Sequence, residues 1–95
     1  MGETKNEAVR NLLSAICSID DIGDAKEFLE DLCTAKEIND MAQRFDTAIK
    51  LYNGANYLNV SSESGISSAT ISRVNKCVKK NGGYVKAIKK LGLGK

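Results

Sequence analysis

The sequence has no histidine, no proline and no tryptophan among its 95 residues, and only five of its residues are aromatic. Histidine is the side chain that most often moves protons in enzymes, and the chain also has neither a paired-carboxylate motif nor a glycine-rich phosphate loop. The lack of proline permits long uninterrupted helices. These absences argue against catalysis, so we predict no catalytic residue and no cofactor.

Cysteines and long apolar runs are scarce as well. The three cysteines, Cys17, Cys33 and Cys77, are odd in number and widely spaced, which fits neither a zinc site nor a disulfide framework. We interpret them as small buried apolar residues in a reducing cytoplasm. No apolar run is long enough to span a membrane, and no signal peptide opens the sequence. We therefore expect a cytoplasmic protein without a metal site or a membrane partner.

The charges are distributed unevenly along the chain. Residues 1–63 hold all 12 acidic residues and 6 basic ones, a net charge of −6, whereas residues 64–95 hold 8 basic residues and no acidic ones. This split favours an acidic body with a basic end that faces nucleic acid. A solvated lysine-rich tail would give the same pattern, so charge alone leaves both interpretations open.

Residues 1–54 show the apolar spacing of three helices. The first ends near Asp20, and Gly23 separates it from a second helix that Asp24 is expected to cap. A capping box, Thr34-Ala35-Lys36-Glu37, opens the third and longest helix, whose broad apolar face can pack on more than one partner helix. These helices carry more apolar surface than the short remainder can cover. We favour a dimer core here, with a compact monomer as the alternative.

Residues 57–80 follow the helix-turn-helix pattern, in which two short helices are joined by a turn that contains glycine. Gly65 suits the turn because glycine adopts a positive φ at little cost. Ser67 is placed to cap the second helix. A last short helix, 83–91, ends the chain. We thus predict one all-α domain over residues 1–95.

The second helix of the motif, 67–80, has the two properties that binding in the DNA major groove requires. Its far end is basic, and cations displace counterions from phosphates. Its exposed side is small and hydroxylated, which lets the backbone approach base edges, and Arg73 can make a bidentate contact with guanine. The residues expected to contact double-stranded DNA are Ser67, Ser68, Ala69, Thr70, Ser72, Arg73 and Lys76. We therefore predict a sequence-specific transcription regulator.

The segment Gly65-Ile66-Ser67-Ser68-Ala69-Thr70-Ile71-Ser72-Arg73-Val74-Asn75 resembles the recognition segment of the Trp repressor superfamily. Two upstream segments, Leu32-Cys33-Thr34-Ala35-Lys36-Glu37 and Met41-Ala42-Gln43-Arg44, are similar to its branch of small Trp-repressor-related proteins of the YerC/YecD type. The likeness covers residues 28–80. It implies an all-α fold of about six helices, an intertwined homodimer and a repressor of transcription. Helix-turn-helix dimers, with the Trp repressor itself among the standard examples, bind half-sites about 34 Å apart.

The resemblance also implies a pocket for a small-molecule effector. In the Trp repressor two arginines sandwich the tryptophan indole, and Arg44 and Arg73 match their positions. The residue after the second arginine is glycine there, whereas here Val74 would fill the space of the ring. We therefore expect tryptophan binding to be lost or weak, and the sequence identifies no other effector.

The candidate effector pocket comprises Thr34, Arg44, Arg73 and Cys77, the last in place of a family serine. A structural role for Arg44 is the alternative, since Asp40 lies four residues earlier on the same helix and can pair with it.

The first motif helix departs from the family pattern. The glutamine and basic residues that reach DNA from this helix in the family are replaced by Tyr57, Leu58 and Ser61. We also expect Tyr57 to contact DNA, and the replacements imply an altered site preference. The lack of cations in this helix also supports an alternative function, a protein-interaction module that has the fold but no specific DNA binding.

Overall fold

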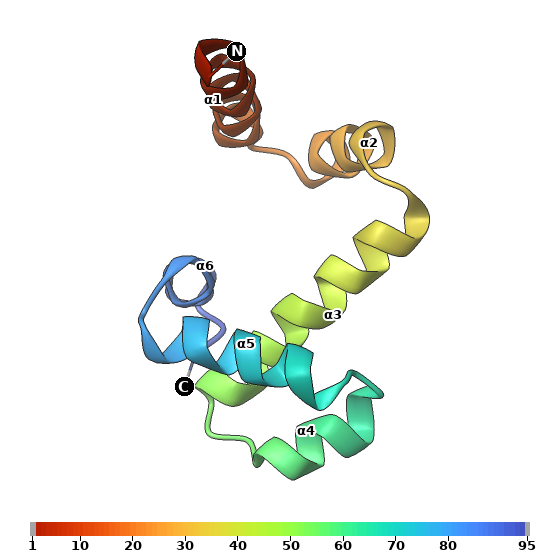
Figure 1. The fold of residues 1–95 in the computed structure, drawn as a ribbon, viewed down its shortest axis with the longest axis vertical. Helices are drawn as coiled ribbons and strands as arrows, with labels where there is room; N and C mark the ends of the chain where they lie inside the picture. The colour runs from red at the N-terminus through yellow and green to blue at the C-terminus, as the bar shows by residue number, and fades with distance from the viewer. Residues whose placement is uncertain (1, 95) are drawn as a thin grey trace. The chain divides into compact units, whose positions relative to one another are not determined.

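The computed structural model describes residues 2–94, with side chains for residues 6–63 and 65–94. Its described residues form the helices α1 (Gly2–Ser18), α2 (Ile22–Leu32), α3 (Ala35–Tyr52), α4 (Tyr57–Ser64), α5 (Ser68–Lys79) and α6 (Gly83–Leu91), and no strand (Figure 1). No described helix is long and apolar enough to cross a membrane. The predicted all-α fold of about six helices is confirmed.

The chain divides into two compact units, and the division falls inside α3. Unit 1, residues 1–38, holds α1, α2 and the first residues of α3. Unit 2, residues 39–95, holds the rest of α3 and the helices α4 to α6. A single domain over residues 1–95 stays a prediction.

Side-chain caps begin two of the helices in unit 1. Asp21 precedes α2 in an extended conformation, and its carboxylate accepts a hydrogen bond from the Asp24 amide at 3.1 Å. The predicted cap at Asp24 was therefore wrong: Asp24 lies in the first turn, where its charge favours the helix dipole, and Gly23 is helical. The capping box of α3 is confirmed, since the Thr34 amide donates to Glu37 Oε1 at 2.8 Å and the Glu37 amide donates to Thr34 Oγ1 at 3.1 Å.

Three large apolar side chains of α1 are exposed. Val9, Leu13 and Ile16 follow one another at helical spacing, and each is at least half exposed. Cys17 is exposed too, so its predicted burial was wrong. No described side chain of unit 1 is buried. The stripe formed by Val9, Leu13 and Ile16 is named the α1 stripe below.

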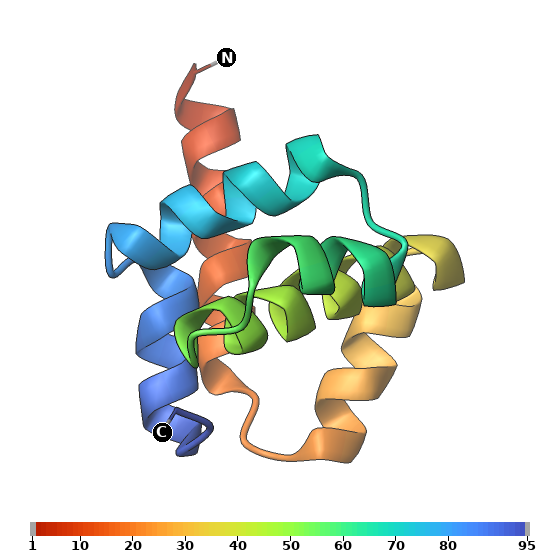
Figure 2. The same cartoon turned by 90° about the horizontal axis from the view of Figure 1, so that it is seen from below.

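The core of the molecule lies in unit 2. Its buried apolar residues are Ala48, Val60, Ile71, Val74, Val78, Val85 and Ile88. Half-buried rings pack against this core, and Phe45 of α3 stacks on Tyr84 of α6 with ring centroids 6.3 Å apart. α5 packs against both α4 and α6, as Figure 2 shows. These contacts hold the second motif helix between its neighbours.

The residues after α6 return to α3. Gly92 ends α6 in the left-handed conformation, and the Leu93 amide donates to the Ile88 carbonyl at 3.0 Å. The side-chain amide of Asn53 donates to the Leu93 carbonyl at 3.1 Å. These bonds fix the C-terminal end of α6 against the end of α3.

Candidate nucleic-acid interface

A three-residue turn joins α4 to α5. Gly65 caps the C-terminus of α4, and its φ of 70° lies in the left-handed region that glycine adopts without a Cβ penalty. Ser67 is extended, and its Oγ accepts a hydrogen bond from the Thr70 amide at 3.3 Å, so the predicted cap of the second helix is confirmed. Two short helices and a tight turn thus occupy the predicted range (Figure 1).

The two sides of α5 differ in chemistry. The inner side carries the buried residues Ile71, Val74 and Val78. Ala69 and Lys76 lie on the opposite side, because the helical period of 3.6 residues places them about half a turn from those three. Ala69 and Lys76 are exposed, and Ser72 beside them is half-buried. This outer face combines a small apolar residue, a hydroxyl and a cation.

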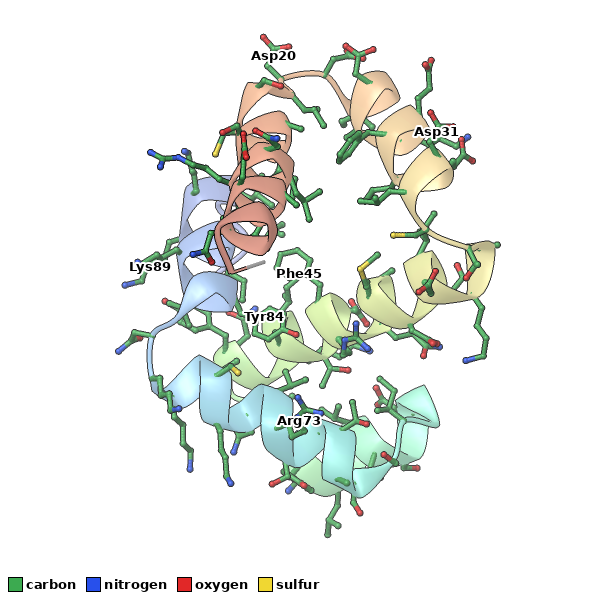
Figure 3. All side chains as sticks on the ribbon, turned by 45° about the horizontal axis from the view of Figure 1, so that its top comes forward. Asp20, Asp31, Phe45, Arg73, Tyr84 and Lys89 are labelled. Atoms are coloured by element: carbon green, nitrogen blue, oxygen red, sulfur yellow. The ribbon has the colours of Figure 1, made fainter. Side chains whose placement is uncertain are left out.

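A cavity of about 360 Å³ lies beside α5. It is lined by Arg44, Thr70, Arg73, Val74, Cys77 and Tyr84. Figure 3 labels Arg73 on α5 and Tyr84 on α6, which approach this space from different helices. The structure therefore brings together three of the four expected pocket residues, Arg44, Arg73 and Cys77. Cys77 is exposed, so its predicted burial was wrong.

The residues that line the cavity differ from the expected set at Thr34 and Tyr84. Thr34 belongs to unit 1, where its hydroxyl caps α3. Tyr84 lines the cavity although sequence reasoning did not single it out. Two features of the sequence could have drawn attention to Tyr84: it is one of only five aromatic residues, and it lies at the start of the last helix.

Thr70 lies on the cavity side of α5 rather than on the outer face. Its Oγ1 is 3.0 Å from Ser67 Oγ, and the residue is half-buried. Thr70 also lines a second cavity of about 230 Å³, together with Asp40, Gln43, Arg44 and Ile66. Asp40 and Arg44 thus share a cavity wall, which follows from their spacing of four residues on α3.

The first turn of α4 is held by polar contacts. Asn56 Oδ1 caps α4 by accepting from the Leu58 amide at 2.8 Å. The half-buried Tyr57 donates its hydroxyl proton to the Ser68 carbonyl at 2.8 Å. The Leu58 side chain is 74% exposed. The surface of α4 is therefore apolar at Leu58, where a phosphate-binding helix would carry a cation.

The exposed cations gather at the far end of α5. Lys76 and Lys79 lie in its last turn, and Lys80 follows as the C-terminal cap. Residues 57–80 contain one acidic residue, Glu63, whose carboxylate lies 3.9 Å from Lys50 Nζ. That exposed pair contributes little stability, but the positive charge of Lys50 offsets the negative charge of Glu63.

Comparison with known proteins gives the family. The chain matches the Trp repressor protein family over residues 7–91. The chain belongs to the Trp repressor family. The resemblance drawn from residues 65–75 is thereby confirmed, and the family is one of DNA-binding transcription regulators rather than enzymes.

Individual relatives agree with this assignment. YerC of Bacillus subtilis (strain 168), an uncharacterized protein, is 38% identical over 74 residues, which are 78% of this chain and 71% of YerC. The crystal structure of a TrpR-like protein from Eubacterium eligens ATCC 27750 matches with a TM-score of 0.85 and 38% identity, over 100% of this chain and 99% of that one. A Staphylococcus aureus structure assigned to the Trp repressors matches with a TM-score of 0.81 and 31% identity, over 92% and 88% of the two chains. The Trp-repressor-like fold is therefore confirmed.

Proposed function

We propose that the chain is a sequence-specific DNA-binding repressor of transcription that reads the major groove with α5. The arrangement of α4, turn and α5 carries this proposal, because Gly65 and Ser67 define where α5 begins and its outer face is polar and basic. Membership of the Trp repressor family supports the regulatory role. The partner is double-stranded DNA.

Different residues of α5 serve affinity and specificity in this proposal. Ala69 and Ser72 are small enough to let the helix approach base edges, where a methyl group or a hydroxyl can be read. Arg73 is exposed at the border between the outer face and the cavity, so its guanidinium can reach a guanine. Lys76 and Lys79 neutralise phosphates. Ser67 and Ser68 lie exposed at the helix start, where the amides favour an anion.

A second copy of the chain completes the proposed repressor. The α1 stripe is uncovered in the single chain, and burying apolar surface of this kind is what drives obligate pairing. A symmetric dimer presents two copies of α5, which read two half-sites one helical turn apart. The proposed homodimer therefore accounts for the exposed apolar residues of unit 1.

The direct test is selection of preferred sites from a random DNA pool, followed by binding measurements across a salt series. Binding should weaken steeply as salt rises, because cations on the protein replace counterions on DNA. Sequence-selective binding is expected; binding that is equal for all duplexes, or absent at every salt concentration, contradicts the proposal.

Two variants separate base reading from phosphate contact. Arg73→Ala should cost about 1–3 kcal/mol of binding free energy at one base pair and relax the preference there. Lys79→Ala should weaken all duplexes alike and lower the salt slope by about 1. An unchanged site preference in Arg73→Ala would remove the base-reading role.

We also propose that the cavity between Arg44 and Arg73 takes a small effector with an anionic group and does not take tryptophan. Two guanidinium groups line it, which suits a carboxylate or phosphate. Val74 is only 2% exposed and forms part of the wall, so its branched side chain occupies space that glycine would leave open. Cys77 completes this wall, while a role for Thr34 stays a prediction.

Calorimetry with tryptophan tests this exclusion. The unmodified protein should show no saturable binding, and Val74→Gly should gain it; Val74→Ala is the milder variant, because it keeps more of the core packing. Saturable micromolar binding by the unmodified protein contradicts the steric argument.

The alternative function is a protein-interaction module, and one observation favours it. α4 contains no basic residue and exposes Leu58 to 74%. An apolar side chain on a helix without cations suits a protein surface better than a phosphate. A partner protein retained at high salt by a chain without affinity for DNA would select this alternative.

A further inference from the structure

One hydrogen bond joins the first residue of α4 to the first residue of α5. The Tyr57 hydroxyl donates to the Ser68 carbonyl oxygen at 2.8 Å, across 11 positions of sequence. The turn at Gly65 already links the end of α4 to the start of α5. The start of α5 is therefore attached to both ends of α4, at one by the chain and at the other by Tyr57.

We infer that Tyr57 is a positioning residue, which holds the first turn of α5 in place for reading bases and does not itself bind DNA. This inference rests on the proposed DNA-binding function. A phenol has one proton to donate, and phosphate oxygens accept hydrogen bonds only. Since the Ser68 carbonyl takes that proton, a contact from Tyr57 to a phosphate would require this bond to break.

The attachment bears on specificity more than on general affinity. Base contacts by α5 depend on donor–acceptor distances within a few tenths of an ångström, so a small movement of the first turn weakens them. The lysines at the far end of α5 act through charge, which tolerates such a movement. The Ser67 cap steadies the same turn only locally, through the Thr70 amide. The Tyr57 hydroxyl instead bonds this turn directly to the first turn of α4.

The test removes a single hydroxyl group. Tyr57→Phe keeps the ring and loses the bond to Ser68, and Tyr52→Phe is the matched control, because it removes the same hydroxyl group from the last residue of α3, outside residues 57–80. Affinity is measured for a duplex selected from a random pool and for a scrambled duplex of equal length. Tyr57→Phe should lose about 3- to 10-fold affinity for the selected duplex, the range expected for one neutral hydrogen bond, and less than about 2-fold for the scrambled one. Tyr52→Phe should change neither.

Other outcomes overturn the inference. An equal loss on both duplexes would show that Tyr57 binds the phosphate backbone directly. No loss on either duplex, or a lowered unfolding midpoint with unchanged selectivity, would leave the hydroxyl without a role in positioning.

A second measurement needs no DNA. Amide hydrogen exchange at Thr70 and Ile71, whose amides donate to Ser67 Oγ and the Ser67 carbonyl, reports how firmly the first turn of α5 is held. Exchange there should be several-fold faster in Tyr57→Phe than in Tyr52→Phe, and equal exchange overturns the inference. If the unmodified protein does not discriminate between duplexes, the proposed function fails, and this exchange measurement still decides the role of Tyr57.

Discussion

Units 1 and 2 are built in contrasting ways. Unit 1 carries nine acidic and four basic residues and buries none of its described side chains, whereas unit 2 carries three acidic and ten basic residues and contains the buried core. Both units are helical, and both begin helices at well-formed caps. Local signals that start a helix are therefore present both in unit 2, which buries its own apolar residues, and in unit 1, which does not.

The contrast separates two sources of stability. In unit 2, apolar side chains of α3, α5 and α6 bury one another, so the stabilising contacts lie within one chain. In unit 1, the α1 stripe contributes little until other apolar surface covers it. Under the proposed homodimer, unit 1 supplies association and unit 2 supplies DNA reading.

The largest expected effect comes from a charge in the α1 stripe. Leu13→Glu should convert the proposed dimer to single chains, because an ionised carboxylate in an apolar interface is strongly unfavourable. Affinity for a two-half-site duplex should fall by about 1,000-fold, or about 4 kcal/mol of binding free energy, since the two copies of α5 no longer bind together. Sedimentation equilibrium gives the mass, and Ser14→Glu, one exposed position along, is the control. An unmodified protein that sediments as one chain would contradict this prediction.

A smaller effect is expected in the core of unit 2. Ile88 is fully buried, and Ile88→Ala should lower the free energy of unfolding by about 3 kcal/mol through lost burial and a residual cavity. Urea unfolding measures the loss, and Lys89→Ala on the same helix should change little because its side chain is exposed. The loss should be the same across a wide range of protein concentrations, which distinguishes contacts within a chain from contacts between chains.

A still smaller effect is expected at the turn of the motif. Apart from its two chain neighbours, no described residue has an atom within 4 Å of the place that a Cβ would take at Gly65. Gly65→Ala therefore meets no clash, and its cost of about 1 kcal/mol comes from the left-handed backbone. Thermal unfolding is the measurement. Gly65→Asn should cost less, because asparagine adopts this conformation more readily. Equal stability of all three proteins would show that the turn relaxes to another conformation.

The smallest effect is expected at Gly23, in the first turn of α2. Alanine favours a helix over glycine by about 1 kcal/mol, but a Cβ on Gly23 would lie 2.9 Å from Asp21 Oδ2, the oxygen that caps α2. The two effects oppose each other, so Gly23→Ala should stay within about 0.5 kcal/mol of the unmodified protein. Asp21→Ala tests the cap alone and should cost about 1 kcal/mol by thermal unfolding. A clear gain from Gly23→Ala would mean that the carboxylate moves aside and keeps its bond.

Short-range features of the chain could be predicted from the sequence. The turn at Gly65, the cap at Ser67 and the capping box from Thr34 to Glu37 depend on residues within three or four positions of each other. The cap of α2 was assigned to the wrong residue, because Asp21 and Asp24 carry the same side chain three positions apart and either could cap the start of a helix. Local competition between equal candidates limits such predictions.

Features of the site that join separate helices could not be predicted in this way. Whether Thr70 lies on the outer face or beside the cavity depends on how α5 rotates against α3 and α6. The place of Tyr84 depends on its stacking with Phe45, which is 39 positions earlier in the sequence. The bond of Tyr57 depends on the angle between α4 and α5. Helical periodicity predicts which residues share a face, but not what that face meets.

The bond from Tyr57 ends on a backbone carbonyl, and this has a consequence for how the protein can change. A carbonyl is present whatever side chain residue 68 carries, so that bond survives substitution at the start of α5. Ser68, Ala69 and Ser72 are therefore free to be exchanged while the helix keeps its place. Selection or design can then change the DNA sequence that α5 recognises without changing the bond that positions this helix.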